Sequence, residues 1–355
     1  MTSLFDPIRL RGLDLANRLW APPMCQYSAG PDGVPTDWHL VHLGGLAAGG
    51  AGLVIAEAAG VSPEGRISPA DVGLWSAEQV TAWRRITAFV HGQGGAIAVQ
   101  LSHAGRKGST QPPHLGRDSV AAEDGGWTTV APSNLAFGRY AAPDALDEAG
   151  IRSVIDDFAA AARNAVGAGF DAVEVHAAHG YLLHQFLSPL SNQRTDEYGG
   201  SLENRARLVL EVVRGIRAEL GDAVPVFVRF SATDYAEGGW DQEQTATVAK
   251  WAQEAGADFF DISTGGNIAG VTIPLGPGYQ VPFADFVGST AQVPVNAVGL
   301  ITEARQAELI VESGQADAVM LGREMMRDPH FALRAAHELG VEVDWEPAYT
   351  RARWR

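Results

Sequence analysis

The sequence has 355 residues and a net charge of −16, from 42 acidic and 26 basic side chains, and 46% of its residues are hydrophobic. An acidic surface disfavours nucleic acids and anionic membranes, and no apolar run approaches the roughly 20 residues that span a bilayer. The single cysteine, Cys25, excludes intramolecular disulfides and iron–sulfur or zinc sites that need several thiolates. The first residues lack a secretory signal, so we expect a cytoplasmic protein.

Short apolar runs alternate with longer helical patterns along the chain, which is typical of repeated βα units. Several of these runs are apolar on both faces, as buried parallel strands are. The pattern predicts an α/β fold, in which a (β/α)8 TIM barrel forms a single domain over residues 1–355. The predicted strands are residues 18–24, 52–57, 96–101, 172–176, 224–229, 259–262, 293–297 and 318–321.

Helical periodicity lies between the predicted strands. Residues 202–220 place Val209, Val213 and Ile216 on one face. Ser201 is the predicted N-cap, because a serine hydroxyl accepts hydrogen bonds from the first free N–H groups of a helix. Similar helices are predicted at residues 77–91, 151–166, 242–255 and 303–313.

Residues 102–148 interrupt this alternation after the third strand and are rich in Gly, Pro, Ser and Thr. A long segment of this kind is usually functional, and is often a lid over an active site. We therefore predict a lid-like excursion that covers the barrel mouth with a short hairpin or small helices.

Candidate site residues lie at and just after the end of the first predicted strand, where catalytic groups project in a barrel. They are Pro23, Met24, Cys25 and Tyr27. Cys25 is either a small buried hydrophobic residue, as lone cysteines often are, or part of a site. Tyr27 by itself is a core or rim aromatic unless a ligand contacts it.

Two polar residues lie near the ends of further apolar strands. Gln100 lies in the third strand, where an unpaired buried amide would be costly, so it either bonds to the backbone or faces a ligand. Arg229 closes the fifth strand and either pairs with a buried carboxylate or holds an anionic ligand. The residues alone leave both alternatives open.

His176, His179 and Tyr181 come at and after the end of the fourth strand. Imidazoles can hydrogen-bond a substrate oxygen, and a phenol can deliver a proton. The spacing of the two histidines is not the i, i+4 helical spacing of zinc proteases, and no matching carboxylate motif follows. Ligand binding is therefore favoured over a metal site or a purely structural role, and no metal is predicted.

Glycine turns follow the last two strands, at Gly299 and at Gly322, which precedes Arg323. Such loops of TIM barrels commonly bind a phosphate through backbone N–H groups. The sequence contains neither a G-x-G-x-x-G nor a P-loop motif. Together with Gln100 and Arg229, a phosphate site here indicates flavin mononucleotide (FMN), because an arginine can balance the charge that gathers on reduction.

One further stretch carries a family resemblance. It reads His184-Gln-Phe-Leu-Ser-Pro189, then Arg194, Asp196, Tyr198-Gly-Gly-Ser201 and Glu203-Asn-Arg205. From Leu4-Phe5-Asp6-Pro7 to near its C-terminus, the chain resembles the old yellow enzyme family of flavin-dependent ene-reductases. The run Pro22-Pro-Met-Cys-Gln-Tyr27 is similar to the thermophilic-like subgroup, which includes bacterial xenobiotic reductases.

The resemblance implies a role for each candidate residue. Cys25 would tune the flavin redox potential, and Tyr181 would donate the proton. The implied FMN-binding residues are Pro23, Met24, Cys25, Ala58, Gln100, Arg229, Gly299, Gly322 and Arg323. The implied substrate-binding residues are Tyr27, Lys107, His176, His179, Tyr181 and Arg351.

The activity that the resemblance implies is that of an FMN-dependent NAD(P)H:enone oxidoreductase. NADPH or NADH would give hydride to flavin N5, which would pass it to an activated C=C bond in a ping-pong mechanism. The expected partners are small activated alkenes such as α,β-unsaturated carbonyls, with nitro compounds as a further class. The subgroup also implies a homodimer or homotetramer, in which Arg351 or Trp354 of the C-terminal tail reaches the neighbouring site.

Two other functions are compatible with a barrel. A flavin-free phosphate-binding lyase or aldolase would want a buried Schiff-base lysine, and no lysine lies within the predicted strands. A non-catalytic ligand-binding barrel would not need His176, His179, Tyr181 and Arg229 together at strand ends.

Overall fold

The strands of the barrel are those that the sequence predicts. The computed structural model describes residues 2–116 and 118–354. Its first barrel strand is shorter than predicted, because Pro22 and Pro23 have no N–H group to continue the ladder. The barrel strands are β3 (Leu19–Trp20), β4 (Val54–Gly60), β5 (Ile97–Ser102), β8 (Ala172–Ala177), β9 (Val226–Ser231), β10 (Phe259–Ser263), β11 (Val295–Ala297) and β12 (Ala318–Met320).

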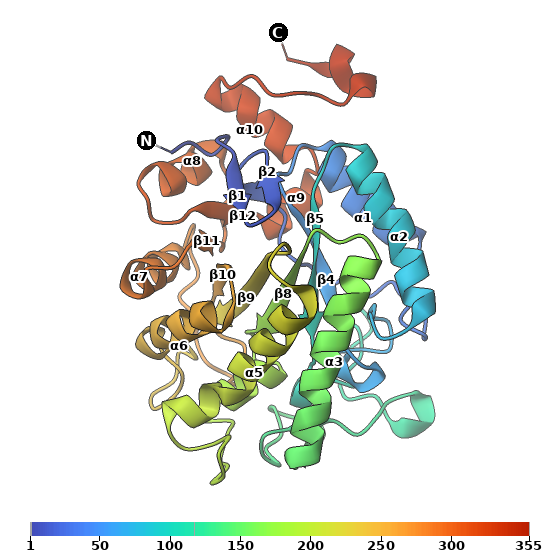
Figure 1. Ribbon diagram of the computed structural model, residues 1–355, viewed down its shortest axis with the longest axis vertical. Coiled ribbons are helices and arrows are strands. Elements are labelled where there is room, and N and C mark those ends of the chain that lie inside the picture. Colours follow the sequence, from blue (N-terminus) through green and yellow to red (C-terminus); the bar gives the residue numbers. More distant parts are fainter. Residues whose placement is uncertain (1, 117, 355) are drawn as a thin grey trace.

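These strands form one closed parallel barrel, which confirms the predicted fold (Figure 1). The sheet order is β3-β12-β11-β10-β9-β8-β5-β4, so neighbours in the sheet are successive barrel strands. The ends of the sheet meet where Ala21 bridges to Val54, and Ile55 N donates to Ala21 O at 3.0 Å. Closure leaves no free strand edge and brings the carboxyl ends of all the strands around one mouth.

Helices cover the outside of the barrel. The predicted helices are all present, and the Ser201 hydroxyl accepts from Asn204 N at 3.3 Å as the predicted N-cap. The helices at residues 37–48, 182–187, 281–291, 322–327 and 331–339 were not predicted; in the first of them, Gly44 and Gly45 weaken the helical signal. The helices are α1 (Asp37–Ala48), α2 (Ala77–Gly92), α3 (Glu148–Gly167), α4 (Leu182–Leu187), α5 (Leu202–Leu220), α6 (Gln242–Ala255), α7 (Val281–Ala291), α8 (Ala304–Glu312), α9 (Gly322–Arg327) and α10 (Phe331–Leu339).

Alternation along each strand decides which side chains enter the barrel. On β9, Val226, Val228 and Phe230 belong to the hydrophobic cluster between strands and helices, whereas Phe227 belongs to the cluster inside the barrel. Arg229 lies two residues after Phe227 and therefore faces the interior, one layer nearer the mouth. By the same alternation, the residues of this polar layer on neighbouring strands are Gln100, Glu174 and Asp261.

The opposite end of the barrel is closed by apolar side chains. The antiparallel hairpin of β1 (Ile8–Leu10) and β2 (Leu13–Leu15) packs Leu10 and Leu15 into one cluster with Trp20, Phe227 and Phe259. The polar layer above this plug therefore forms a floor that faces the mouth.

The segment 102–148 lies at the mouth end (Figure 1). It contains the short helical turns Gly105–Lys107 and Ala122–Asp124, as expected, and two short strands, β6 (Val130–Ala131) and β7 (Asp144–Ala145). β6 and β7 pair in parallel and do not form a hairpin, whereas Thr110 and Ser119 form an isolated antiparallel bridge. That the segment acts as a lid stays a prediction.

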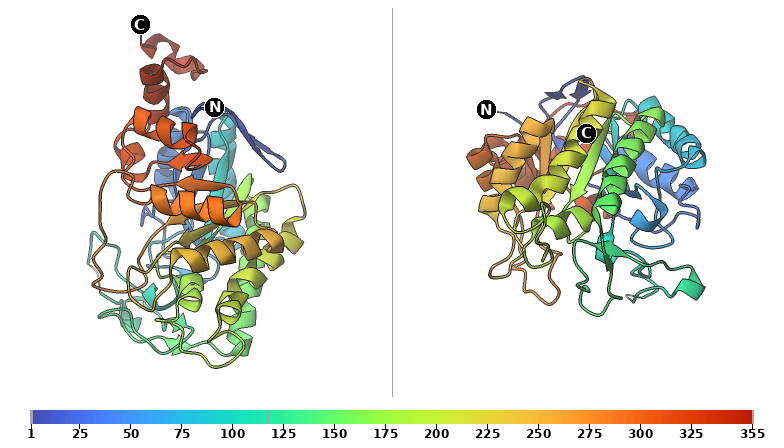
Figure 2. Two further views of the ribbon diagram at one scale, coloured as in Figure 1. Left: turned by 90° about the vertical axis from the view of Figure 1, so that its left-hand side faces the viewer. Right: turned by 60° about the horizontal axis from the view of Figure 1, so that its bottom comes forward.

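The C-terminal tail lies at the end of the molecule opposite this segment (Figures 1 and 2). Its last helical turn, Pro347–Ala352, contains Arg351, which is exposed. Trp354 stacks on His337 with ring centroids 5.0 Å apart. Neither Arg351 nor Trp354 therefore reaches the mouth of its own barrel.

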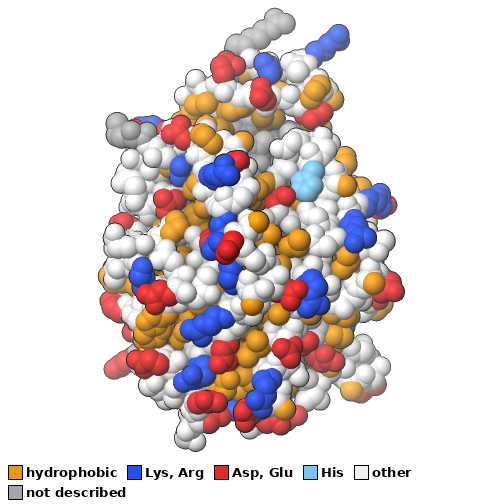
Figure 3. Space-filling model, viewed as in Figure 1, with side chains coloured by type: hydrophobic (Ala, Val, Ile, Leu, Met, Phe, Trp, Pro, Cys, Tyr) orange, Lys and Arg blue, Asp and Glu red, His pale blue; other side chains and the backbone are white. Residues whose placement is uncertain are grey.

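Charged side chains of both signs are interspersed over the face shown in Figure 3. Among residues 2–116 and 118–354, no helix is both long and apolar enough to cross a membrane.

Candidate active site

A cavity of about 430 Å³ opens at the carboxyl ends of β9, β10, β11 and β12. Its volume is within the range of small-molecule and cofactor sites. Residues from well-separated parts of the chain meet there because barrel closure brings the strand ends together. The predicted site residues that line the cavity are Pro23, Met24, His179, Arg229, Gly299, Gly322 and Arg323.

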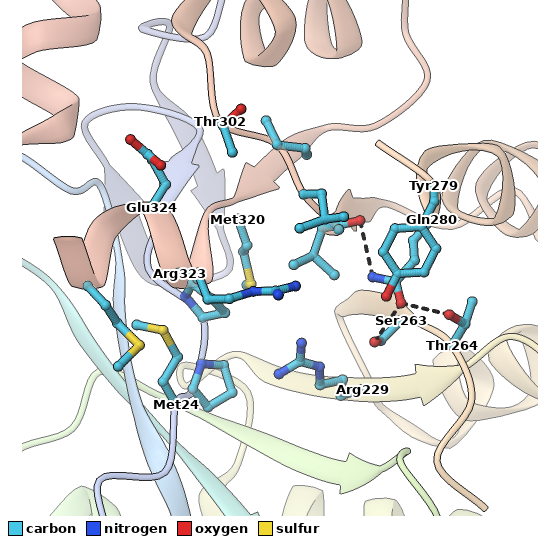
Figure 4. Close-up of a pocket in the computed structure, with 18 of the residues that line it drawn as sticks. Met24, Arg229, Ser263, Thr264, Tyr279, Gln280, Thr302, Met320, Arg323 and Glu324 are labelled. Carbon is cyan, nitrogen blue, oxygen red and sulfur yellow. Dashed lines mark hydrogen bonds between the residues drawn. The ribbon is translucent and has the colours of Figure 1, made fainter. Parts of the chain in front are cut away.

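The part of the cavity next to β12 suits an anionic group. Arg323 lines it and points into it (Figure 4). The neighbouring carboxylate of Glu324 is already paired with Arg327 at 2.5 Å, so it does not neutralise Arg323. Gly322 adjoins Met24 and Pro22 in this part of the lining, and a Cβ there would make only ordinary contacts, at 3.5 Å from each.

Arg229 takes part in both arrangements that the sequence left open. Its Nε lies 2.7 Å from Asp261 Oδ2, which is a buried ion pair. Its guanidinium group also lines the cavity and points into it (Figure 4). The carboxylate thus holds one edge of the guanidinium and leaves the other edge to a ligand.

The side-chain amide of Gln100 bonds a buried side chain and not the backbone, and a contact with a ligand stays a prediction. Gln100 Nε2 donates to Glu174 Oε1 at 2.7 Å, and Gln100 does not belong to the described lining of the cavity. Burial and, to a smaller extent, the nearby Asp261 carboxylate raise the pKa of Glu174 to about 8, although Arg229 and the hydrogen bond from Gln100 oppose the shift. Burial also raises the pKa of Asp261. At neutral pH the floor therefore holds Arg229 together with a proton on one of the carboxyl groups.

We expect Glu174→Gln to change how stability depends on pH. Because the folded-state pKa is raised, the contribution of Glu174 to stability is complete below its unfolded pKa of about 4.3 and is lost as pH rises through about 8. Glutamine keeps the acceptor for Gln100 and does not ionise.

Urea unfolding of the apoprotein at low and high pH measures this difference. Between the unfolded and folded pKa values of Glu174, the unfolding free energy of the variant should rise relative to wild type by on the order of 1 kcal/mol per pH unit. The exposed-residue variant Glu254→Gln is the control. If the unfolding free energy of Glu174→Gln differed from that of wild type by the same amount at every pH, the raised pKa of Glu174 would be contradicted.

The two histidines and the tyrosine form one wall at the end of β8. The ring centroid of His176 lies 5.2 Å from that of His179 and 5.0 Å from that of Tyr181. Burial and the charge of Arg229 lower the pKa of both histidines well below the ordinary value, so both are neutral. Burial raises the pKa of Tyr181, so its phenol stays protonated. His176 Nδ1 is buried and has no hydrogen-bond partner among the described residues.

Cys25 is next to the cavity lining in sequence and shares a packing cluster with Tyr181 of the wall. It follows Met24 of the cavity lining, and with Tyr181 it packs against the buried cluster of Ala58, Ile67 and Ala104. Burial, with smaller effects of Asp71 and Glu57, raises the pKa of Cys25, so it is a thiol at neutral pH. Burial and Cys25 likewise raise the pKa of Tyr27.

Lys107 supports the wall rather than the cavity. Its ammonium donates to His179 O at 2.8 Å and to Gly266 O at 2.9 Å, and lies 5.1 Å from the centre of the Tyr181 ring. Burial and the nearby Arg106 lower its pKa to about 7. The structure thus places Lys107 beside Tyr181, where it joins two loops.

Two glycines allow these loops to touch. Gly180 and Gly266 both have positive φ, at 72° and 92°. A Cβ on Gly266 would lie 2.7 Å from the backbone of His179, and a Cβ on Gly180 would lie 2.3 Å from Gly266 O. The position of the His179 imidazole therefore depends on the absence of a side chain at residue 266.

We expect Gly266→Ala to displace the His179 backbone and to lower both stability and turnover. The matched control is Gly270→Ala in the same loop, where φ is 79° but a new Cβ meets open space. Gly270→Ala should lose only the unfolding free energy that positive φ costs a non-glycine residue, about 1 kcal/mol, whereas Gly266→Ala should lose more. Melting temperatures and steady-state rates of the two variants test this, and equal losses would contradict it.

Several polar residues of the site were not predicted from the sequence. Ser263 and Thr264 donate to Gln280 Oε1 at 3.1 and 2.7 Å (Figure 4). Glu174 and Asp261 lie in otherwise apolar strands, and this was an available signal, because a buried carboxylate needs a partner. Their partners could not be read from the sequence.

Comparisons with known proteins extend over the whole barrel. The model of the NADH:flavin oxidoreductase / NADH oxidase family matches residues 3–342. An NADH:flavin oxidoreductase of Gibberella zeae is 47% identical over 361 aligned residues, covering 96% of this chain and 87% of that protein. An NADPH dehydrogenase of Listeria monocytogenes is 43% identical, with 100% of both chains covered.

Solved structures show the same likeness. Morphinone reductase in complex with tetrahydroNAD is 29% identical with a TM-score of 0.79, and the match covers 98% of this chain and 94% of that one. The old yellow enzyme homologue from Zymomonas mobilis is 29% identical with a TM-score of 0.79, and the match covers 100% of both chains.

Proposed function

The chain belongs to the NADH:flavin oxidoreductase / NADH oxidase family, that of the old yellow enzymes, and from this membership we propose that it reduces activated C=C bonds. As a member of this family it is an oxidoreductase that uses FMN and NAD(P)H. The proposed substrates are small α,β-unsaturated carbonyl compounds, with nitro compounds as a further class. The supporting observation is the wall of His176, His179 and Tyr181, three uncharged hydrogen-bond donors beside a cavity lined by arginines.

The chemistry of the cavity fits FMN. Arg323, with the glycine turns at 299 and 322, would hold the phosphate. Arg229, Pro23 and Met24 would bind the isoalloxazine. Bound FMN supplies a carrier that takes hydride from NAD(P)H and gives it to the alkene. Cys25, Ala58 and Gln100 do not belong to the described lining, and for them cofactor contact is a proposal from the family resemblance.

The two histidines would bind the carbonyl oxygen of the substrate. Both imidazoles are neutral, so each has one N–H to donate, and His176 Nδ1 is buried without a partner among the described residues. His179 Nε2 lies 2.7 Å from Ser263 Oγ. Because Thr264 also donates to Gln280 Oε1, the Ser263 hydroxyl can turn from that oxygen and donate to His179 Nε2, which would leave the other nitrogen of His179 protonated. Two donors of this kind stabilise negative charge that develops on the carbonyl oxygen.

Tyr181 would complete the reduction by giving its proton to the carbon next to the carbonyl. Addition of one hydride and one proton saturates the double bond while NAD(P)H becomes NAD(P)+. The raised pKa of Tyr181 keeps the proton available at neutral pH, and the ammonium of Lys107 beside the ring would stabilise the phenolate that remains. Tyr27 would shape the pocket for the substrate.

We also propose that the single domain assembles into a homodimer or homotetramer in which the tail contributes to a neighbouring site. Arg351 and Trp354 lie at the end of the molecule opposite their own mouth, so they can meet a site only in another subunit. Light scattering of the holoenzyme measures the assembly, and a monomer would rule this part out.

An anaerobic absorbance titration tests the proposed function. The flavin absorbance band of the holoenzyme should bleach when NADPH is added and return when 2-cyclohexenone follows. If the band bleaches with NADPH but does not return with the enone, the protein is still an NADPH-dependent flavin oxidoreductase, but the proposed substrate class is wrong. A protein that binds no FMN would support the flavin-free lyase or aldolase instead.

A further inference from the structure

The turn that carries His179 and Tyr181 is held at each backbone polar atom of residues 179 and 180. His179 and Gly180 are consecutive residues with positive φ, at 57° and 72°, a conformation that a non-glycine residue keeps only when its surroundings impose it. His179 N donates to Ser231 Oγ at 2.9 Å, and Gly180 N donates to His184 Nδ1 at 3.0 Å. His179 O accepts from Lys107 Nζ at 2.8 Å, and Gly180 O accepts from Gln185 Nε2 at 2.7 Å.

The bond between Gly180 and His184 determines which nitrogen of this imidazole carries the proton. Gly180 N–H can only donate, so His184 Nδ1 must be the bare, accepting nitrogen. The proton is therefore on Nε2, which lies 3.1 Å from Asp234 Oδ1. His184 and Asp234 are both completely buried.

Asp234 has the charge and the contacts to hold this tautomer. Burial would raise its pKa, but His184, Ser188 and Trp240 N lower it to about 2, so it is a carboxylate. Its second oxygen accepts from Ser188 Oγ at 2.5 Å and from Trp240 N at 3.0 Å. The carboxylate is thereby fixed in position, and its first oxygen is available to accept from His184.

We propose that His184 and Asp234 are positioning residues of the active site. His184 holds the Gly180 N–H, Asp234 holds His184 in the Nε2–H tautomer, and the turn then presents the His179 imidazole and the Tyr181 phenol together. Neither His184 nor Asp234 touches the cavity. The kinetic consequence rests on the proposed function, whereas the tautomer does not.

An asparagine at residue 234 shows why the charge matters. If its amide nitrogen took the place of Oδ2, it would face Trp240 N–H with a second donor. If it took the place of Oδ1, His184 would have to move its proton to Nδ1, where it would meet the Gly180 N–H. Each orientation leaves two donors facing each other in a buried place, so Asp234→Asn should disturb the tautomer or the turn.

The first test reads the tautomer directly. Nitrogen-15 NMR of the histidine-labelled holoenzyme should show His184 with bare Nδ1 and protonated Nε2, assigned by the signal that His184→Asn removes. In Asp234→Asn this pattern should change, or the turn should be displaced and reoxidation by the enone slowed. A proton on Nδ1 in wild type would overturn the proposal, and so would an Asp234→Asn protein whose His184 signals and reoxidation rate both match wild type.

The second test compares two substitutions of His184. Asparagine places its side-chain oxygen where Nδ1 was, so it can accept from Gly180 N–H, whereas leucine of similar size cannot. His184→Leu should slow reoxidation of the reduced enzyme by 2-cyclohexenone by about 10- to 100-fold, mainly in kcat, because the proton donor is displaced. His184→Asn should recover most of this loss. Equal rates of the two variants, or a wild-type rate in His184→Leu, would overturn the proposal.

A third measurement separates positioning from general damage. In the Tyr181→Phe background, His184→Leu should slow reoxidation less than it does in wild type, because part of its effect passes through Tyr181. Equal slowing in both backgrounds would overturn the proposal. If wild type is not reoxidised by the enone at all, the proposed function fails, and the NMR result still decides the roles of His184 and Asp234.

Discussion

Tyr181→Phe is expected to slow enone reduction by about 10²- to 10⁴-fold, the usual contribution of a positioned general acid. The substitution removes the phenolic proton and keeps the ring that packs beside His176. Reduction of the bound flavin by NADPH should stay near the wild-type rate, because that step needs no proton from the tyrosine. Stopped-flow absorbance of the two half-reactions measures both rates separately.

The matched control for this variant is Tyr198→Phe. The Tyr198 hydroxyl is bonded to Glu211 at 3.0 Å and lies outside the cavity lining, so its loss should change stability slightly and neither rate. Full enone turnover in Tyr181→Phe would show that water or another group supplies the proton. The role of His184 would then be limited to His179.

Arg229→Met is expected to weaken FMN binding and to destabilise the protein. A lost charge-assisted hydrogen bond corresponds to about 1.5–3 kcal/mol, or roughly a 10- to 150-fold increase in the FMN dissociation constant. The substitution also leaves Asp261 buried without its cation, which costs about 3–5 kcal/mol of unfolding free energy. Fluorescence of released FMN and urea unfolding of the apoprotein measure the two effects.

The pH dependence of this variant has a defined sign. Removal of Arg229 raises the pKa of Asp261 further, because its cation opposes the effect of burial. A carboxyl group with a raised folded-state pKa stabilises the protein at low pH, and this stabilisation is lost as pH rises. Arg229→Met should therefore destabilise the protein more in alkaline than in acidic buffer.

The double variant Arg229→Met/Asp261→Asn is the control for the buried charge. It should recover most of the unfolding free energy, because no unpaired carboxylate remains, while FMN binding stays weak. Recovery of tight FMN binding in the double variant would show that Arg229 acts through Asp261 alone and does not contact the cofactor.

The predictions that needed only local information agree with the structure. Short runs that are apolar on both faces identified the barrel strands, and Ser201 identified the start of α5, because both signals depend on residues a few positions apart. The segment from His184 to Arg205 indicated the family for a similar reason, since its motif is contiguous. The chemistry expected at strand ends followed once a barrel was assumed.

The tertiary structure decided which buried polar side chains bond to one another. Gln100 bonds Glu174, Arg229 pairs with Asp261, and His184 pairs with Asp234, over separations of 74, 32 and 50 residues. Strand register and barrel closure set these pairs, and neither is encoded in the residues next to them. For the same reason Lys107 bonds the backbone of His179, which the sequence did not indicate, while its contact with the substrate stays a prediction. The sequence determined which side chains could do the chemistry, and the closed barrel determined which of them meet.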